Sequence, residues 1–592
     1  MSEIKMVNFK IDGVPVSVPA GTTLLEAAKQ AGVKIPTLCY MKDINEIGAC
    51  RMCVVEAGGR ALQTACMYPV EFLPRDRVTG EVVEVKTNTP KIRKVRKVNL
   101  ELLLSNHDKK CLSCVRSTTC ELQALCREYG VEDENRFSGG KMTETSVDNS
   151  SLSIVRNNAK CVLCRRCVAV CQKVQGVGVI GPVNRGFKTQ ILPAWNMGLA
   201  ETGCINCGQC INVCPTGALT EKDDTAEVFA ALADPEKFVV VQPAPAVRAA
   251  LGEEFGIPMG TSVTGKMAAA LRRLGFDKVF DTDFAADLTI MEEATELIGR
   301  VQNGGVLPMI TSCSPGWIKF CETYYPDFIP NLSSCKSPHE MEGAVIKSYF
   351  AEKNGIDPHK IVVVSVMPCT AKKYECKRPE LGHDGMSDVD IVITTRELAR
   401  MIKMSGIDFN KLPDEDFDEM LGESTGAAVI FGVTGGVMEA ALRTAYEVIT
   451  GDKLDKLEFN DVRGFEGVKE ASYNLKGLEV KVAIASSTGA ASKLLDAVKS
   501  GEKSYTFIEV MGCPGGCVNG GGQPIVSPNV REDVDVKGLR AKALYDEDAS
   551  KAIRKSHEAP AVQKLYDEYF EKPNSHKAHE LLHTTYTKRN RY

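Results

Sequence analysis

The chain has 592 residues, 23 of them cysteine, with a net charge of −5. One hydrophobic core rarely serves such a length, so several domains are expected, and the charge gives no general case for nucleic-acid binding. No run of about 18 apolar residues predicts a membrane span. The N-terminus lacks the features of a secretory signal peptide, and the cysteines fall in tight groups. We therefore expect a cytoplasmic protein with metal-bound thiolates, in place of a disulfide framework.

Residues 1–80 predict a small domain with two strands, a helix and a cysteine loop. Alternating apolar residues mark strands at 7–13 and 14–18, and 23–32 reads as a helix closed by glycine. The loop carries Cys39, Cys50, Cys53 and Cys66. This order resembles the β-grasp ferredoxin fold with a [2Fe–2S] cluster, in the variant found in the large iron–sulfur subunit of respiratory complex I. A four-cysteine zinc site is the alternative, because zinc accepts the same ligands.

Residues 81–136 contain one histidine followed by three cysteines. The four candidate ligands are His107, Cys111, Cys114 and Cys120. They resemble the [4Fe–4S] site with one histidine ligand in the same complex I relatives, although a lone histidine is more often a surface or core residue. A neutral imidazole in place of a thiolate would raise the potential of the cluster. The basic stretch 91–97 is expected to be a solvated helix face.

Residues 137–222 repeat the cysteine spacing of bacterial two-cluster ferredoxins. In that pattern the fourth cysteine of each repeat binds the other cluster. We expect one [4Fe–4S] cluster on Cys161, Cys164, Cys167 and Cys214, and another on Cys204, Cys207, Cys210 and Cys171. Four clusters in one chain indicate a route for electrons, and that route must end at a catalyst or at a partner.

Residues 223–592 read as a large α/β domain with mostly parallel sheets. Buried strands are predicted at 238–242, 278–280, 306–310, 361–366 and 480–485, and helices at 265–274 and 285–300. Cys313, Cys369 and Cys513 directly follow strand-like segments. Loops at the carboxyl ends of parallel strands carry the sites of such proteins. In the run 509–524, glycines surround Cys513 and Cys517 and allow backbone N–H groups to approach a charged ligand.

The motifs at 311–317, 367–375 and 509–524 resemble the active-site motifs of [FeFe]-hydrogenases. With the N-terminal clusters, the resemblance covers essentially the whole chain. It implies reversible reduction of protons to H2 at an H-cluster, which is a [4Fe–4S] cubane joined to a two-iron unit with CO, cyanide and a dithiolate. By this resemblance Cys369 and Cys513 would bind the cubane, Cys517 would bridge to the two-iron unit, and Lys372 would compensate the cyanide charge. Further cofactor contacts are expected from Met367, Pro368, Met511 and Gln523.

One position departs from the family pattern. The family commonly has two adjacent cysteines in its first motif, a proton relay and then a cubane ligand, whereas this chain has Cys313 followed by Ser314. Sequence register makes Cys313 the relay and Ser314 the ligand. The preference of iron for thiolate over hydroxyl favours the reverse. Under both interpretations the two residues lie at the active site.

A buried catalyst needs a route for protons. Glu293, Glu296 and Arg300 share one face of a predicted helix, and with Ser333 they match the proton path of the family. Carboxylates suit this role because burial raises their pKa toward neutrality. The alternative is an ordinary salt-bridged helix surface.

Two forms of the enzyme fit the sequence, a free-standing hydrogenase linked to ferredoxin and the H2-handling subunit of an NAD(P)-linked, electron-bifurcating complex with flavin iron–sulfur subunits. The chain has no dinucleotide fingerprint of its own, and Ser314 slightly favours the complex. The alternative from another class is a sensory or electron-carrier protein with a non-catalytic site. Hydrogenase maturation proteins are expected partners, and an anaerobic cell is the expected setting. Four cysteines are left as free buried thiols: Cys126, Cys321, Cys335 and Cys376.

Overall fold

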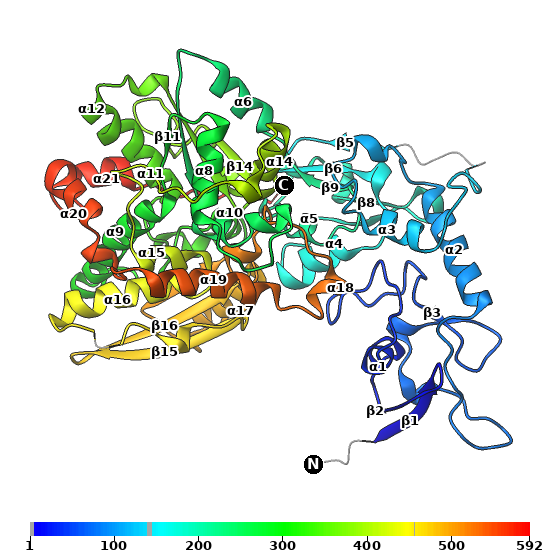
Figure 1. Cartoon of the computed structure of the whole chain (residues 1–592). Helices are drawn as coiled ribbons and strands as arrows, with labels where there is room; N and C mark the ends of the chain where they lie inside the picture. The colour runs from blue at the N-terminus through cyan, green and yellow to red at the C-terminus, as the bar shows by residue number, and fades with distance from the viewer. Residues whose placement is uncertain (1–4, 139–144, 455, 592) are drawn as a thin grey trace.

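The computed structural model describes residues 5–138, 145–454 and 456–591. Figure 1 shows the N-terminal unit, in blue, extending away from the rest of the molecule. A cyan unit with short strands lies beside the large body, which runs from green to red. The blue unit also meets the large body directly, since the Thr37 hydroxyl donates a hydrogen bond of 2.8 Å to the side chain of Asn529. The chain thus consists of three small units and one large α/β unit.

The N-terminal unit is built on a β-hairpin and one helix. Strands β1 (Met6–Ile11) and β2 (Val14–Pro19) pair antiparallel around a turn that contains Gly13, whose φ of 86° is accessible to glycine. Helix α1 (Leu24–Gln30) begins where the Thr23 side chain accepts a hydrogen bond from the backbone N–H of Glu26. Buried side chains alternate along both strands, so the hairpin covers the core with one face.

The next two units contain short elements around cysteine loops. Helices α2 (Pro90–Leu104) and α3 (Glu121–Glu128) form the second unit. The third has the antiparallel sheet β5 (Val147–Asp148), β6 (Ile154–Asn157) and β9 (Leu219–Glu221), with helices α4 (Arg166–Ala169) and α5 (Gln209–Asn212).

The basic face predicted at 91–97 is solvent-exposed only in part. Lys91, Arg93 and Lys94 are exposed on α2, but Arg96 is buried and donates a hydrogen bond of 2.9 Å to the carbonyl oxygen of Val54. Arg96 therefore ties the second unit to the first, because a guanidinium can satisfy a buried carbonyl across an interface.

Two four-stranded sheets organise the large unit. The first has the order β11 (Lys278–Val279), β10 (Phe238–Pro243), β13 (Ile361–Met367) and β14 (Ile391–Thr394), all parallel. The second has the order β12 (Met309–Ile310), β17 (Phe507–Met511), β16 (Leu478–Ser486) and β15 (Val468–Leu475), and only the β15–β16 pair is antiparallel. The predicted α/β class with mostly parallel sheets is confirmed.

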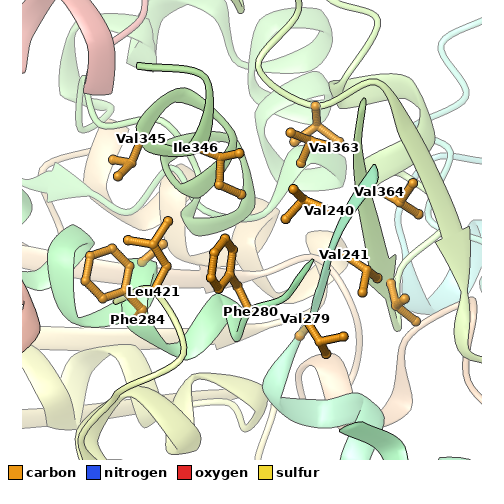
Figure 2. Packing of buried hydrophobic residues seen from close by; sticks show 14 of the residues in the cluster. Val240, Val241, Val279, Phe280, Phe284, Val345, Ile346, Val363, Val364 and Leu421 are labelled. Atoms are coloured by element: carbon orange, nitrogen blue, oxygen red, sulfur yellow. The ribbon is translucent and has the colours of Figure 1, made fainter. Parts of the chain in front are cut away.

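The first sheet is buried on both faces. Val240 pairs with Val363 and Val241 with Val364, and all four side chains are fully buried. Figure 2 shows them among side chains of the covering helices, such as Ile346. Successive residues of a strand point to opposite faces, which explains why β10 and β13 are continuous runs of valine.

Some predicted bounds were wrong by a few residues. Helix α8 (Thr264–Leu274) agrees with its prediction, whereas α9 (Thr282–Asn303) starts three residues before its predicted start, because the Asp281 side chain caps it. The strand predicted at 306–310 is reduced to Met309–Ile310, since Pro308 has no N–H to donate to β17.

Candidate active site and cluster sites

The four cysteines of the first unit come together in its core. Cys39, Cys50, Cys53 and Cys66 are all buried, and the Sγ atoms of Cys53 and Cys66 are 3.3 Å apart. A hydrogen bond from the Cys50 thiol lowers the pKa of Cys39 to about 7, although burial opposes this. Paired thiols that share protons in this way are suited to bind a soft metal centre as thiolates.

The predicted ligands of the second unit line one cavity of about 300 Å³. His107, Cys111, Cys114 and Cys120 all contribute to its wall. Burial lowers the pKa of His107 to about 4, so the imidazole is neutral at pH 7. Its buried Nδ1 atom has no hydrogen-bond partner among the described residues. A buried, unsatisfied ring nitrogen beside three thiols fits a metal ligand better than a core histidine.

The third unit has two cavities, each lined by four cysteines. Cys161, Cys164 and Cys167 line one together with Cys214, while Cys204, Cys207 and Cys210 line the other together with Cys171. The structure thus places each fourth cysteine with the other repeat, as the two-cluster ferredoxin pattern predicts.

The cavity of the large unit lies at the carboxyl ends of strands from both four-stranded sheets. Loops at the carboxyl ends of β12, β13 and β17 contribute Cys313, Cys369, Cys513 and Cys517 to its wall. Such loops converge at the edge of parallel sheets, so residues some 200 positions apart become neighbours. The wall also includes Ser314, Lys372, Met367, Pro368 and Met511. Gln523 lies behind this wall and donates a hydrogen bond of 2.8 Å to the carbonyl oxygen of Ala246.

The thiols of the cavity are held in an apolar environment. Burial raises the pKa of Cys369 and of Cys513, and it raises that of Cys517 to about 12. Binding to iron would deprotonate them, because a metal ion stabilises the thiolate. The donor set of soft thiols in a buried pocket therefore fits an iron–sulfur group.

Lys372 is the cation of this cavity. Its Nζ atom lies 2.8 Å from a carboxylate oxygen of Glu375 and donates to the carbonyl oxygen of Cys313 at 3.2 Å. Burial opposes its charge, but Glu375 outweighs this and raises the pKa of Lys372. Lys372 therefore stays positively charged in the buried pocket and can compensate the charge of an anionic ligand. The next residue, Lys373, is buried as well and pairs with Asp224 and Glu397.

Cys313 and Ser314 occupy different parts of the cavity wall. Burial raises the pKa of Cys313 well above its usual range, and Glu293 lies close enough to raise it further when it is ionised. The Ser314 hydroxyl accepts a hydrogen bond of 3.0 Å from the backbone N–H of Gly512, next to Cys513. Cys313 therefore lies on the side of the carboxylates, and Ser314 on the side of the cysteine loop.

The predicted proton-path residues form a connected group behind Cys313. The Ser333 hydroxyl donates to Glu296 at 3.2 Å, and Arg300 makes an ion pair with Glu296 at 2.5 Å. Burial, reinforced by the Glu296 charge, raises the pKa of Glu293 to about 8. One oxygen of Glu293 has no hydrogen-bond partner among the described residues. A carboxyl group with these properties can both hold and release a proton near neutral pH.

Several residues of the site have no signal in the sequence. His339 lines the cavity and hydrogen-bonds to Glu375 at 2.8 Å, which holds the carboxylate that pairs with Lys372. Ser334 and His583 extend the group around Glu296. Glu375, by contrast, is the last residue of the motif at 367–375 and lies three residues after Lys372. His583 could not be found in this way, because it comes from a segment about 250 residues further along the chain.

Known protein families match segments in each of the four units. Residues 237–521 match the C-terminal domain of the iron-only hydrogenase large subunit, and 534–589 match the iron hydrogenase small subunit. Residues 4–72 match a 2Fe-2S iron–sulfur cluster binding domain, 96–135 the NADH-ubiquinone oxidoreductase-G iron–sulfur binding region, and 160–218 a 4Fe-4S dicluster domain.

Two relatives match over their whole lengths. The "NADP-reducing hydrogenase subunit HndD" of Solidesulfovibrio fructosivorans is 52% identical, covering 99% of this chain and 100% of the relative. The chain belongs to the [FeFe]-hydrogenase family. "Iron hydrogenase 1" of Clostridium pasteurianum is 44% identical, covering 98% of this chain and 100% of the relative. This hydrogenase is thus an oxidoreductase with [2Fe–2S] and [4Fe–4S] clusters and an H-cluster.

A solved structure supports the fold of the catalytic unit. The apo [FeFe]-hydrogenase HydA1 of Chlamydomonas reinhardtii is 43% identical, with a TM-score of 0.56, and matches 62% of this chain and 100% of its own. The match confirms that the α/β unit is the hydrogenase catalytic domain. Across the described residues, no helix combines the length and apolar character that crossing a bilayer requires.

Proposed function

We propose that this hydrogenase moves protons to its catalyst through Glu296, Ser333, Glu293 and Cys313, while electrons travel through the N-terminal clusters. The observation that carries this proposal is the continuity of the group: Ser333 donates to Glu296, Glu296 lies close enough to raise the pKa of Glu293, and Glu293 acts in the same way on Cys313. The H-cluster supplies the electron and hydrogen chemistry when bound, and the protein residues hold and pass the proton.

Replacement of Glu296 tests the path. Glu296→Gln should slow H2 evolution by about 10²–10⁴-fold, because an amide cannot gain and lose a proton. The infrared bands of CO and cyanide should be unchanged, since Glu296 does not line the cavity. A variant that turns over as fast as the wild type removes Glu296 from the path.

The cofactor content follows from the cavities and their thiols. We assign one [2Fe–2S] cluster, three [4Fe–4S] clusters and the H-cluster to four units at 1–80, 81–136, 137–222 and 223–592. Purified protein should contain about 20 iron atoms per chain. Zinc at Cys39 to Cys66 would contradict the first assignment.

Cys517→Ser should lose the two-iron unit and its infrared bands but keep the paramagnetic signals of the N-terminal clusters, because a serine hydroxyl is a poor bridge between irons.

We assign the relay to Cys313 and the fourth cubane position to Ser314. Cys313 lies beside Glu293, whereas the Ser314 hydroxyl oxygen accepts a hydrogen bond from the backbone N–H of Gly512, the residue before Cys513. Oxygen binds iron less readily than thiolate, so this ligand should weaken the cubane or alter its potential.

Protein made without the maturation system tests this assignment, because its H-cluster site would hold the cubane without the two-iron unit. Ser314→Cys should change the paramagnetic spectrum and the potential of the cubane, whereas Cys313→Ser should leave both as they are. Loss of the cubane in Cys313→Ser would exchange the two roles.

We further propose that the chain is the H2-handling subunit of an NADP-linked complex. The support is its 52% identity, over the full length, to a relative named as a subunit of an NADP-reducing hydrogenase. Flavin iron–sulfur subunits would then supply the nucleotide site, with ferredoxin as a second electron carrier and the cytoplasm of an anaerobic cell as the setting. Native mass of the protein purified from its own cells should exceed 64.3 kDa and include a flavin. A lone chain that exchanges electrons with ferredoxin would instead support the free-standing form.

A further inference from the structure

A histidine from the C-terminal segment reaches the carboxylate at the outer end of the proposed proton path. Helix α21 (His576–Leu582) ends at His583, whose side chain is only 5% exposed. Its Nδ1 atom lies 2.8 Å from the hydroxyl oxygen of Ser334. The same hydroxyl donates to Glu296 at 3.1 Å. One serine hydroxyl thus connects the imidazole ring to the carboxylate.

The other side of the ring is held by a second carboxylate. The Nε2 atom of His583 lies 3.1 Å from Glu292, which is fully buried. Glu292 also accepts hydrogen bonds from the Tyr566 hydroxyl at 2.5 Å and from the backbone N–H of Asn574 at 2.8 Å. A carboxylate only accepts, so it holds the proton on Nε2 and leaves Nδ1 to exchange with Ser334.

The backbone fixes this arrangement. The segments around Cys335 and His583 pair as an antiparallel bridge. Lys336 donates its N–H to the carbonyl oxygen of Leu582 at 2.8 Å, and Thr584 does so to that of Ser334, also at 2.8 Å. His583 lies opposite Cys335 in this bridge, and Ser334 is the adjoining residue of the facing segment. The contact between Ser334, His583 and Glu296 is therefore built into the fold.

The ring also adjoins the surface. His579 is exposed on α21, and its ring centroid lies 4.1 Å from that of His583. Glu296 itself is only 13% exposed and is covered by Arg300. Imidazole is well suited to exchange protons near neutral pH, and the His583 ring stands beside a second, exposed imidazole.

We propose that His583 delivers protons to Glu296 through the Ser334 hydroxyl, as a second inlet to the proton path. The imidazolium Nδ1–H passes its proton to the Ser334 oxygen as the Ser334 proton passes to Glu296. The ring is left neutral, with its remaining proton on Nε2 held by Glu292, and its Nδ1 atom takes up the next proton from water before the step repeats. No bond other than O–H and N–H forms or breaks, and no electron is moved. The inference rests on the proposed role of Glu296.

The test uses the fully loaded enzyme and isotope exchange between H2 and heavy water, which needs proton transfer but no electron donor. His583→Gln keeps a side chain that can bond Glu292 but cannot carry a proton. Ser334→Ala removes the hydroxyl and keeps the backbone bridge. Each should slow exchange by roughly tenfold, less than a lost catalytic acid, because direct exchange at Glu296 remains. The solvent isotope effect should rise in both.

The double variant and a matched control separate a relay from a structural role. If the two residues act in series, His583→Gln with Ser334→Ala should be no slower than either single variant. His576→Gln, on the same helix with a side chain 91% exposed, should match the wild type. Effects that multiply in the double variant, or single variants at the wild-type rate, would overturn the proposal.

A second measurement does not depend on activity. In protein made without the maturation system, the infrared carboxylate bands that disappear in Glu296→Gln belong to Glu296. These bands should shift in Ser334→Ala and in His583→Gln, and unchanged bands in both would break the link. If Glu296→Gln exchanges at the wild-type rate, the whole path fails; if only the His583 and Ser334 variants do so, the second inlet alone fails.

Discussion

At the scale of single residues, burial and one charged neighbour decide the protonation state of Lys372 and of Glu293. Lys372 keeps its charge because Glu375 lies 2.8 Å away, and His339 in turn holds Glu375. Burial and the Glu296 charge instead keep Glu293 protonated. The same buried environment thus maintains one fixed cation and one exchangeable proton.

The raised pKa of Glu293 has a measurable consequence. The folded protein binds the proton up to pH about 8, whereas the ordinary value is 4.5. Between these values the folded state holds a proton that the unfolded state lacks, so this group makes stability fall as pH rises. Relative to the wild type, Glu293→Gln should gain thermal stability between pH 5 and 8, on the order of a few °C. A protonated-carboxyl infrared band lost near pH 8 in the wild type should be absent in the variant. A difference in melting temperature that stays constant with pH would contradict the shift.

At the scale of elements, the loop after β17 owes its path to glycines. Gly516 has a φ of 91°, and an added Cβ would lie 2.6 Å from the backbone nitrogen of Thr434. Gly501 also has a positive φ, of 78°, but open space around it. A positive φ disfavours a side chain at both positions, and Gly516 is crowded as well.

This pair makes a controlled experiment. Gly501→Ala should cost about 1–2 kcal/mol of stability and leave the H-cluster in place. Gly516→Ala should in addition displace the wall of the cavity, and CO and cyanide bands should be weak or lost after maturation. Normal bands in Gly516→Ala would show that the loop can relax without harm to the site.

The elements also show what the sequence can predict. Cysteine spacing and runs of valine act locally, so the cluster ligands, the strand β10 and the three catalytic loops were all accessible to sequence reasoning. His583, Glu292 and His339 gain their roles only from distant segments that pack together, and no local pattern marks them. The burial of Lys373 is equally hidden from local sequence, because its partners Asp224 and Glu397 come from elsewhere in the chain.

At the scale of the whole molecule, the third unit and the catalytic loop share a close junction. Gln175 donates to the carbonyl oxygen of Gly512 at 2.9 Å, and Gln209 of α5 donates to that of Asn519 at 2.9 Å. A Cβ on Gly521 would lie 2.7 Å from the Cα atom of Gly208, next to Cys207. The absence of a side chain there lets the cluster at Cys207 approach the catalytic cysteines.

Gly521→Ala should therefore separate the two redox sites and slow H2 evolution driven through the N-terminal clusters, because electron transfer weakens steeply with distance. Isotope exchange at the H-cluster should change less. Gly467→Ala is the control, since its Cβ would meet only Ala490 at an ordinary 3.9 Å. Equal losses of both activities in Gly521→Ala would point to general damage, and wild-type electron transfer would show that the spacing is not critical.

The same junction limits how the chain can be divided. Solved relatives such as HydA1 correspond to 62% of this chain, which invites removal of everything before residue 223. Such a cut would leave the carbonyl groups of Gly512, Asn519 and Gly520 without the side-chain donors that now satisfy them. Buried carbonyls that lose their partners destabilise the loops that hold them. The third unit therefore supports the loops of the active site in addition to carrying electrons. A shortened enzyme would need other residues to bond these carbonyl groups.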